Sequence, residues 1–181
     1  LHKMTYHTLR LILGDQLNAQ HSWLQEKDPS ILYVLMEILP ETQYVQHHVQ
    51  KVCAFFLAMR AFATQLQATG HQVKYFQLDD SDNQQSFEAN CQALIESHSI
   101  QKLEYQLPDE WRLDQLLKSF CQSLSIPHQV YDSEHFLSTR SELADLFKGK
   151  KTYLMESFYR KIRQKHQILM EPDGKTPLTR R

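Results

Sequence analysis

A strand-like run that ends in a glycine and a carboxylate stands near the start of the chain: Leu9-Arg10-Leu11-Ile12-Leu13-Gly14-Asp15-Gln16-Leu17-Asn18. The apolar residues from Leu9 to Leu13 predict a short β-strand. Gly14 then offers backbone conformations that other residues avoid, and Asp15 places a carboxylate directly beyond the strand. Two explanations fit this pattern: an ordinary turn with a capping acid, or the edge of a ligand crevice.

The remainder of the chain alternates between short β-rich runs and longer helical ones. Four further strands are predicted at residues 31–37, 73–78, 103–107 and 128–131. The run from Ile31 to Glu37 is almost continuously apolar, which is typical of a strand covered on both faces. This alternation predicts an α/β fold: a five-stranded, mostly parallel, doubly wound, Rossmann-like sheet with helices on both faces. A helical turn is also expected between Gln16 and Ser30.

The segment after the second strand carries the clearest helical pattern. Its apolar residues recur at alternating spacings of four and three, which places them on one helical face. They are Val45, Val49, Val52, Phe56, Met59, Ala63 and Leu66. Because Cys53, Leu57 and Phe62 widen this face, we expect a well-buried helix that follows the strand directly and ends at Gly70.

Composition and motifs narrow the class of function. No apolar run approaches the roughly 18 residues that cross a bilayer, and no signal-peptide pattern is present, so we expect a cytoplasmic protein without a membrane partner. P-loop, dinucleotide-binding, HExxH and GxSxG motifs are missing from the sequence, so we name no catalytic residue. The three cysteines form no CxxC pair. We therefore predict no metal site and expect each cysteine to be a small, buried helix residue.

The C-terminal part differs from the rest in charge. Residues 148–181 contain ten Lys or Arg and three Asp or Glu, a net charge of +7, whereas the preceding residues contain ten and eighteen, a net charge of −8. We therefore divide the chain into an α/β domain, residues 1–149, and a basic tail with one helix, residues 150–181. Arg160, Lys161 and Arg163 are candidate contacts for DNA or for another domain. Such a tail either meets phosphates or packs on an acidic surface, and both alternatives stay open.

Acidic residues follow every predicted strand. They are Asp15, Glu37, Asp79, Asp80, Asp109, Glu110 and Asp132. The carboxyl ends of parallel strands meet at one edge of the sheet, and open α/β sheets bind ligands there. The sequence therefore predicts a pocket with an acidic rim, which suits a neutral, hydrogen-bonding ligand better than a polyphosphate.

Seven short motifs, taken in order, resemble one known family. They are Leu11–Leu17, Glu37, Tyr44–Lys51, Ala58–Phe62, Gly70–Val73, Glu110–Arg112 and Met155–Arg160. In order and spacing they resemble the deoxyribodipyrimidine photolyase-related proteins, the bacterial photolyase and cryptochrome branch that carries an iron–sulfur cluster. The similarity extends over about residues 9–170.

The resemblance implies a fold and a function. Members of this family join an N-terminal α/β domain, to which this chain corresponds, to a C-terminal helical domain that binds FAD and the iron–sulfur cluster. Light-driven electron transfer from the flavin repairs damaged DNA, and the α/β domain can hold an antenna such as 6,7-dimethyl-8-ribityllumazine. The resemblance thus implies an antenna and scaffold domain without catalysis of its own. Its partners would be the C-terminal helical domain and, through that domain, damaged DNA.

Position and resemblance together give the candidate antenna-binding residues. They are Gly14, Asp15, Gln16, Glu37, Tyr44, His47, His48, Lys51 and Val52. Asp15 and Glu37 are predicted to accept hydrogen bonds from ribityl hydroxyls and the ring N–H, and Tyr44 and Val52 to flank the ring. Two alternatives remain: a free-standing small-ligand-binding domain of the same fold, and a nucleic-acid-binding module that uses the basic tail.

Overall fold

The computed structural model describes residues 5–176 and 178, which form two compact units divided between Ser133 and Glu134. Unit 1, up to Ser133, contains the whole β-sheet, and unit 2, from Glu134, contains two short helices. The functional division of the chain at residue 150 stays a prediction.

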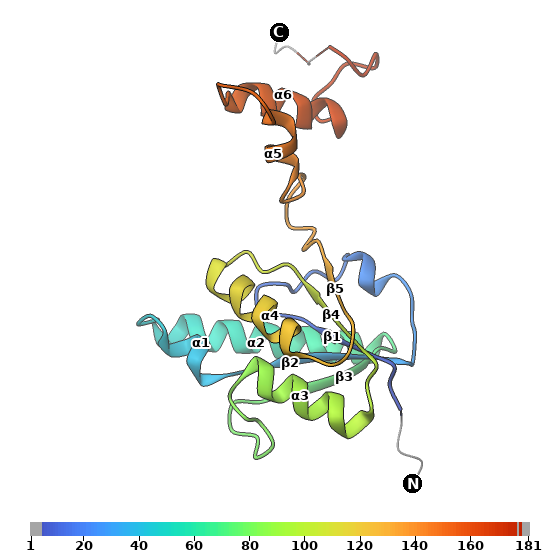
Figure 1. Cartoon of the computed structure of the whole chain (residues 1–181), viewed down its shortest axis with the longest axis vertical. Coiled ribbons are helices and arrows are strands. Elements are labelled where there is room, and N and C mark those ends of the chain that lie inside the picture. Colours follow the sequence, from blue (N-terminus) through green and yellow to red (C-terminus); the bar gives the residue numbers. More distant parts are fainter. Residues whose placement is uncertain (1–4, 177, 179–181) are drawn as a thin grey trace. The chain divides into compact units, whose positions relative to one another are not determined.

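Unit 1 is built on a five-stranded parallel sheet in the order β3-β2-β1-β4-β5. The strands are β1 (Thr8–Leu11), β2 (Ile31–Met36), β3 (Gln72–Phe76), β4 (Lys102–Gln106) and β5 (His128–Tyr131). β1 lies at the centre, where Leu9 is in register with Leu32 of β2 and Leu103 of β4. From β1 the chain continues to β2 and β3 on one side of it, and then places β4 and β5 on its other side (Figure 1). The strand order therefore reverses between β1 and β4. The predicted doubly wound α/β fold is confirmed.

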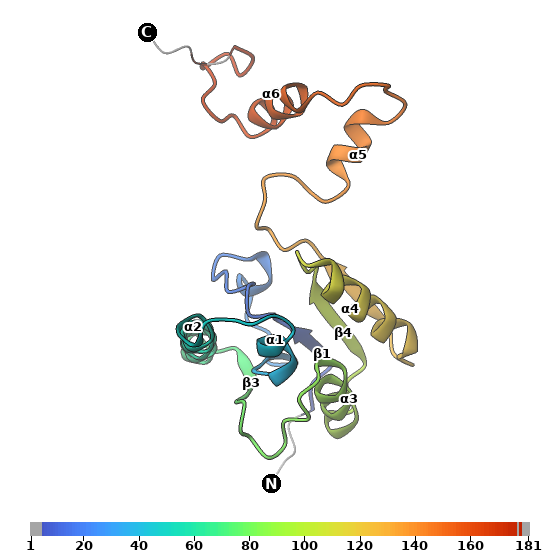
Figure 2. The same cartoon turned by 90° about the vertical axis from the view of Figure 1, so that its left-hand side faces the viewer.

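Two helices cover one face of the sheet: α3 (Phe87–His98) and α4 (Trp111–Ser123). Figure 2 shows both on the same side, with α2 on the other. Alternate residues of the central strands, such as Leu11 and Val34, pack against Cys91 of α3 and Leu117 of α4 in one buried cluster. The larger part of the core lies on this side.

The opposite face carries α2 (Val49–Ala68) and the one-turn helix η1 (Ser22–Leu24), which confirms the expected helical turn. Phe62 and Leu66 of α2 share a buried cluster with Trp23 of η1. A polar contact also ties η1 to the sheet, because Nη1 of Arg10 donates to the carbonyl of Trp23 at 3.1 Å. Nε of the same arginine pairs with Glu104 at 2.8 Å.

The long helix differs from the expectation in its start and in its burial. A short helix with a proline in its first turn, α1 (Leu39–Gln43), separates it from β2, and α2 begins only at Val49. His48 sets this start, because its side chain accepts a hydrogen bond from the N–H of Gln50 at 3.2 Å. The expectation that Cys53 and Leu57 are buried was wrong: both are exposed, because only one side of α2 rests on the sheet.

Unit 2 contains α5 (Glu142–Phe147) and α6 (Met155–Lys165). The two helices are joined by an ion pair of 2.8 Å between Lys165 and Glu142. Phe147 is buried, the only apolar side chain to be so among the residues of this unit that the structure describes, and its ring meets Tyr153 edge-on at 5.4 Å. Within the ranges that the structure describes, no helix is long and apolar enough to span a membrane.

Candidate functional site

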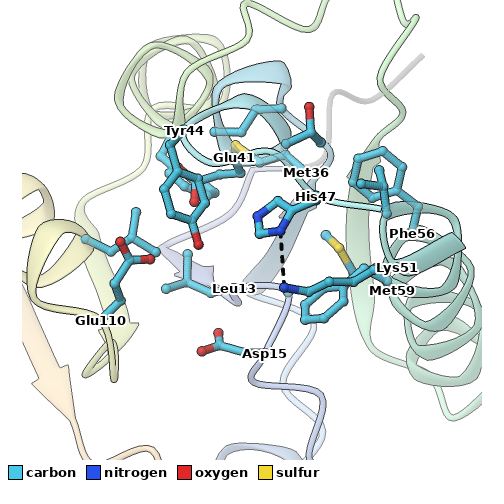
Figure 3. Close-up of a pocket in the computed structure, with 17 residues that line it drawn as sticks. Leu13, Asp15, Met36, Glu41, Tyr44, His47, Lys51, Phe56, Met59 and Glu110 are labelled. Atoms are coloured by element: carbon cyan, nitrogen blue, oxygen red, sulfur yellow. Dashed lines mark hydrogen bonds between the residues drawn. The ribbon is translucent and has the colours of Figure 1, made fainter. Parts of the chain in front are cut away.

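A cavity of about 190 Å³ opens at the carboxyl edge of the sheet in unit 1 (Figure 3). Its lining comes from the ends of β1 and β2 and the segments that follow them, from α1 and α2, and from the starts of α3 and α4. The residues are Leu13, Gly14, Asp15, Met36, Ile38, Glu41, Thr42, Tyr44, His47, Lys51, Val52, Phe55, Phe56, Met59, Phe87, Glu110 and Leu113. This is the edge and the strand reversal where open α/β sheets bind ligands.

The cavity has an apolar wall and a polar rim. Val52, Phe55, Phe56 and Met59 form the wall along α2. They lie at helical spacings of three and four, so the same periodicity that packs α2 on the sheet also points side chains into the cavity. Figure 3 shows the carboxylate of Asp15 at the rim. The arrangement suits a ring-shaped ligand with polar substituents.

The small size of Gly14 allows close packing where it lines the cavity. Its φ is not among the positive values found at other glycines, so the predicted need for backbone freedom was wrong. A Cβ atom built on Gly14 would lie 3.0 Å from Sδ of Met59 and 3.5 Å from the ring of Phe55. The missing side chain therefore lets the end of β1 approach α2 closely and leaves the cavity open.

Gln16 organises the turn beneath the cavity and does not line it. Its side chain is buried, and Oε1 accepts a hydrogen bond from the N–H of Leu13 at 3.0 Å. Nε2 donates to the carbonyls of Gln106 and Leu107 at 3.2 and 3.3 Å. Gln16 thus fastens the end of β1 to the end of β4, on both sides of the strand reversal.

The connection between α1 and α2 supplies the cationic part of the rim. Nζ of Lys51 lies 3.3 Å from Nδ1 of His47 (dashed in Figure 3), and the ring of Tyr44 meets that of His47 edge-on at 5.4 Å. His48 does not line the cavity, because its side chain caps α2. Among the adjacent histidines, therefore, one lines the cavity and the other sets the start of the helix.

Arg112 joins α1 to the start of α4 through Glu41 and Glu110, two residues that line the cavity, and we refer to this set of contacts as the Arg112 clasp. Its guanidinium donates two hydrogen bonds to Glu41, at 2.9 and 2.6 Å, and two to Glu110, at 2.8 and 3.2 Å. The same group lies 4.5 Å from the ring centroid of Tyr44. The hydrogen bonds to Glu41 and Glu110 raise the pKa of Arg112 against the opposing effect of burial. Sequence reasoning missed the contact between Arg112 and Glu41, because these residues are 71 positions apart.

Glu37 lies near the cavity but faces away from it. Successive strand residues point to opposite faces, so Met36 and Ile38 line the cavity while Glu37 points toward α2. Arg60 and the hydroxyl of Tyr75 donate to its carboxylate, and the N–H of Leu78 donates to it at 2.9 Å. Burial alone would raise the pKa of Glu37, but these hydrogen bonds outweigh it and hold the pKa below its ordinary value.

The structure brings six of the nine candidate antenna-binding residues to the cavity. They are Gly14, Asp15, Tyr44, His47, Lys51 and Val52. Whether these six bind a chromophore stays a prediction. Sequence reasoning missed Glu41 and Thr42 because it did not predict α1. It assigned Phe56 and Met59 only to the core, although they also line the cavity.

The three candidate tail residues lie on α6 in unit 2. Arg160 pairs with Glu156 one turn earlier at 2.5 Å. Arg163 donates from Nε and Nη2 to the carbonyls of Ile168 and Leu169 beyond the helix, at 3.2 and 2.6 Å. Lys161 is exposed. Two of these three cations therefore have structural partners, and a DNA contact stays a prediction.

The family described as deoxyribodipyrimidine photo-lyase-related protein matches residues 10–179. The chain belongs to this family. A curated relative, the (6-4) photolyase of Agrobacterium fabrum, is 35% identical over 173 residues, which are 94% of this chain and 33% of the relative. The chain thus spans about a third of the length of the curated relative that it matches.

Proposed function

We propose that this chain forms the antenna and scaffold domain of a photolyase-related protein and holds a ribityl-lumazine-type chromophore in the cavity at the strand reversal. The observation that carries the proposal is the combination of one apolar wall, from Val52 to Met59, with a rim of hydrogen-bonding groups. Family membership supports a light-dependent role, and the relative in Agrobacterium fabrum is named a (6-4) photolyase.

The residues of the cavity fit such a group in chemistry. The wall of Phe55, Phe56 and Met59 offers contacts to a flat ring, and the missing Cβ of Gly14 leaves room for one. Asp15 and Thr42 offer oxygen acceptors for hydroxyl groups at the rim. The cavity is smaller than the roughly 300–1,000 Å³ of fully enclosing ligand sites. It therefore suits a ligand with a compact ring and a flexible chain that reaches the solvent.

The rim also favours an uncharged ligand over a phosphorylated one. Asp15, Glu41 and Glu110 are carboxylates, and the guanidinium of Arg112 is already bound to two of them. Lys51, beside His47, supplies a cation on the α2 side. A phosphate group would meet more negative than positive charge here, which disfavours riboflavin phosphate relative to an unphosphorylated ribityl compound.

A bound lumazine would absorb blue light and pass the excitation energy to a nearby acceptor. The resemblance implies that this acceptor, FAD, and the iron–sulfur cluster belong to a C-terminal helical domain, which would also meet damaged DNA. The residues of this chain would bind and orient the chromophore and exclude water from it. We therefore propose that the chain performs no bond-making step by itself.

The test is titration of the natural protein that contains this sequence with 6,7-dimethyl-8-ribityllumazine, followed by absorption and fluorescence. We expect saturable binding that Val52→Phe, which fills the cavity, weakens by about tenfold or more. Val130→Phe, at an exposed valine of β5 outside the cavity, is the matched control and should bind normally. Binding unchanged in Val52→Phe would reject this cavity as the site. If the protein binds a ligand without a ribityl chain more tightly than it binds the lumazine, this result would favour the alternative hypothesis of a free-standing ligand-binding domain.

A further inference from the structure

Two adjacent histidines hold the connection between α1 and α2, residues 44–48, beside the cavity. The side chain of His47 is half-buried and lines the cavity, and its Nδ1 lies 3.3 Å from Nζ of Lys51. The side chain of His48 is exposed, and its Nδ1 accepts a hydrogen bond from the N–H of Gln50 at 3.2 Å. Both contacts tie the connection to the first turn of α2.

Each of these two contacts requires a histidine ring that carries no proton on Nδ1. The ammonium group of Lys51 and the backbone N–H of Gln50 are donors only, so Nδ1 must be the acceptor in both pairs. Protonation turns both nitrogens of an imidazole ring into donors, and the acceptor is then lost. Histidine is the side chain whose charge ordinarily changes between about pH 5 and 8. A fall in pH through this range would therefore remove both contacts by the same chemical event.

The charges around His47 would separate a protonated ring from Lys51. The ammonium group of Lys51, on α2, repels an imidazolium, and so does the guanidinium of Arg112, on α4, which lies over the ring of Tyr44. Carboxylates from the end of β1, from α1 and from the start of α4 would draw the protonated ring toward themselves; they are Asp15, Glu41 and Glu110. At His48, the partial positive charge of the α2 N-terminus repels a protonated ring in the same way.

We propose that His47 and His48 form a histidine switch, which holds the α1–α2 connection against the cavity when both rings are neutral and releases it in mild acid. The proposal rests on the proposed function in assuming that the cavity binds a ligand. Tyr44 and His47 of this connection both line the cavity, so its release would displace two of the lining side chains. The ligand is therefore retained near neutral pH and dissociates faster in acid.

Hydrogen exchange tests the histidine switch without any chromophore. The natural protein that contains this sequence is exchanged at about pH 7.5 and about pH 5.5, and peptides that cover residues 39–52 are followed by mass spectrometry. Each rate is divided by the rate of an unstructured chain at the same pH. We expect this corrected exchange to be about tenfold faster in acid, because a helix cap and a hydrogen bond are lost together. The dissociation rate of 6,7-dimethyl-8-ribityllumazine should rise several-fold over the same range.

Variants that keep the acceptor but cannot be protonated are the sharpest check. In His47→Asn and His48→Asn an amide oxygen replaces Nδ1 as the acceptor, and asparagine is a good helix cap. The double variant should show the same corrected exchange at both pH values. Lys51→Met removes the donor to His47 and should speed corrected exchange already at the higher pH. His128→Asn, at an exposed histidine of β5 outside the cavity, is the matched control and should keep the wild-type pH dependence.

Three results would overturn the proposal. Corrected exchange of the wild type is equal at both pH values, or its pH dependence persists unchanged in the double variant, or bound lumazine dissociates at the same rate at both pH values. The second result would assign the titration to other groups. Exchange is measured without chromophore, so a protein that binds no lumazine but shows the pH-dependent exchange rejects the antenna function alone. A protein that binds lumazine and shows no such dependence rejects the histidine switch alone.

Discussion

The two carboxylate oxygens of Glu37 accept hydrogen bonds of 2.6 and 2.8 Å from Nε and Nη2 of Arg60. The Glu37 side chain is fully buried, whereas that of Arg60 is 44% exposed, so the pair extends from the interior to the surface. It joins the end of β2 to α2 next to Met59, which lines the cavity. Neither residue touches the cavity, yet together they hold its wall in place.

Removing either partner of this pair should have unequal effects on stability. In Arg60→Met the buried carboxylate of Glu37 loses its cation. We expect the free energy of unfolding to fall by roughly 2–4 kcal/mol, somewhat less than for a fully buried pair. Glu37→Gln should cost less, because Arg60 can then turn to solvent. Urea unfolding of the two variants measures the difference. A larger loss in Glu37→Gln would contradict this account.

The same carboxylate should make stability depend on pH in the acid range. The pKa of Glu37 is lowered in the folded protein from its ordinary value of 4.5. A lowered pKa means that the ionised form stabilises the fold above pH 4.5, and that this contribution is lost as the pH falls through the folded-state pKa. Urea unfolding at pH values from 7 to 3 should show the stability of the wild type approaching that of Glu37→Gln. A constant gap between them would exclude Glu37 as the titrating group.

Gly14→Ala should narrow the cavity. The new Cβ would lie 3.0 Å from Sδ of Met59, so the methionine or α2 must shift. We expect lumazine binding to weaken by about tenfold, which corresponds to about 1.4 kcal/mol, as measured by fluorescence titration. Gly149→Ala is the control, because its positive φ of 74° strains alanine while its Cβ meets nothing within 4 Å. It should lose stability without a change in affinity.

The sequence predicted the architecture well because hydrophobic periodicity reports which faces are buried. It failed where the answer depends on the direction of one side chain. Glu37 stands at the expected strand end, but strand alternation alone could have shown that Met36 and Ile38 point away from it. Cys53 and Leu57 extend the apolar stripe of α2 as core residues would, and no local signal separates a buried face of the helix from an exposed one. The contact between Arg112 and Glu41 joins residues that are too distant in sequence for any spacing rule.

Replacing single basic residues of α6 should show which of them stabilise unit 2 and which do not. Arg163 bonds to two carbonyls beyond the helix, so Arg163→Ala should destabilise unit 2 and increase its proteolysis. Lys161→Ala, at an exposed neighbouring position, should leave proteolysis unchanged.

A DNA contact by the tail would give Lys161→Ala a second effect. The slope of the logarithm of DNA affinity against the logarithm of salt concentration should become shallower by about one. Equal salt slopes for wild type and Lys161→Ala would reject a contact through this residue.

The Arg112 clasp should control how fast a ligand leaves the cavity. In Arg112→Gln the hydrogen bonds to Glu41 and Glu110 and the contact with Tyr44 are lost, so α1 and the α1–α2 connection are no longer held to α4. Both carboxylates reach solvent, and we therefore expect a stability loss of no more than about 1 kcal/mol. The dissociation rate of lumazine should nevertheless rise several-fold in stopped-flow fluorescence, because the mouth opens more often. Lys118→Gln, which breaks an ion pair with Asp114 in the same helix away from the cavity, is the matched control and should keep the wild-type rate. Identical dissociation rates for Arg112→Gln and the wild type would mean that the clasp does not close the mouth.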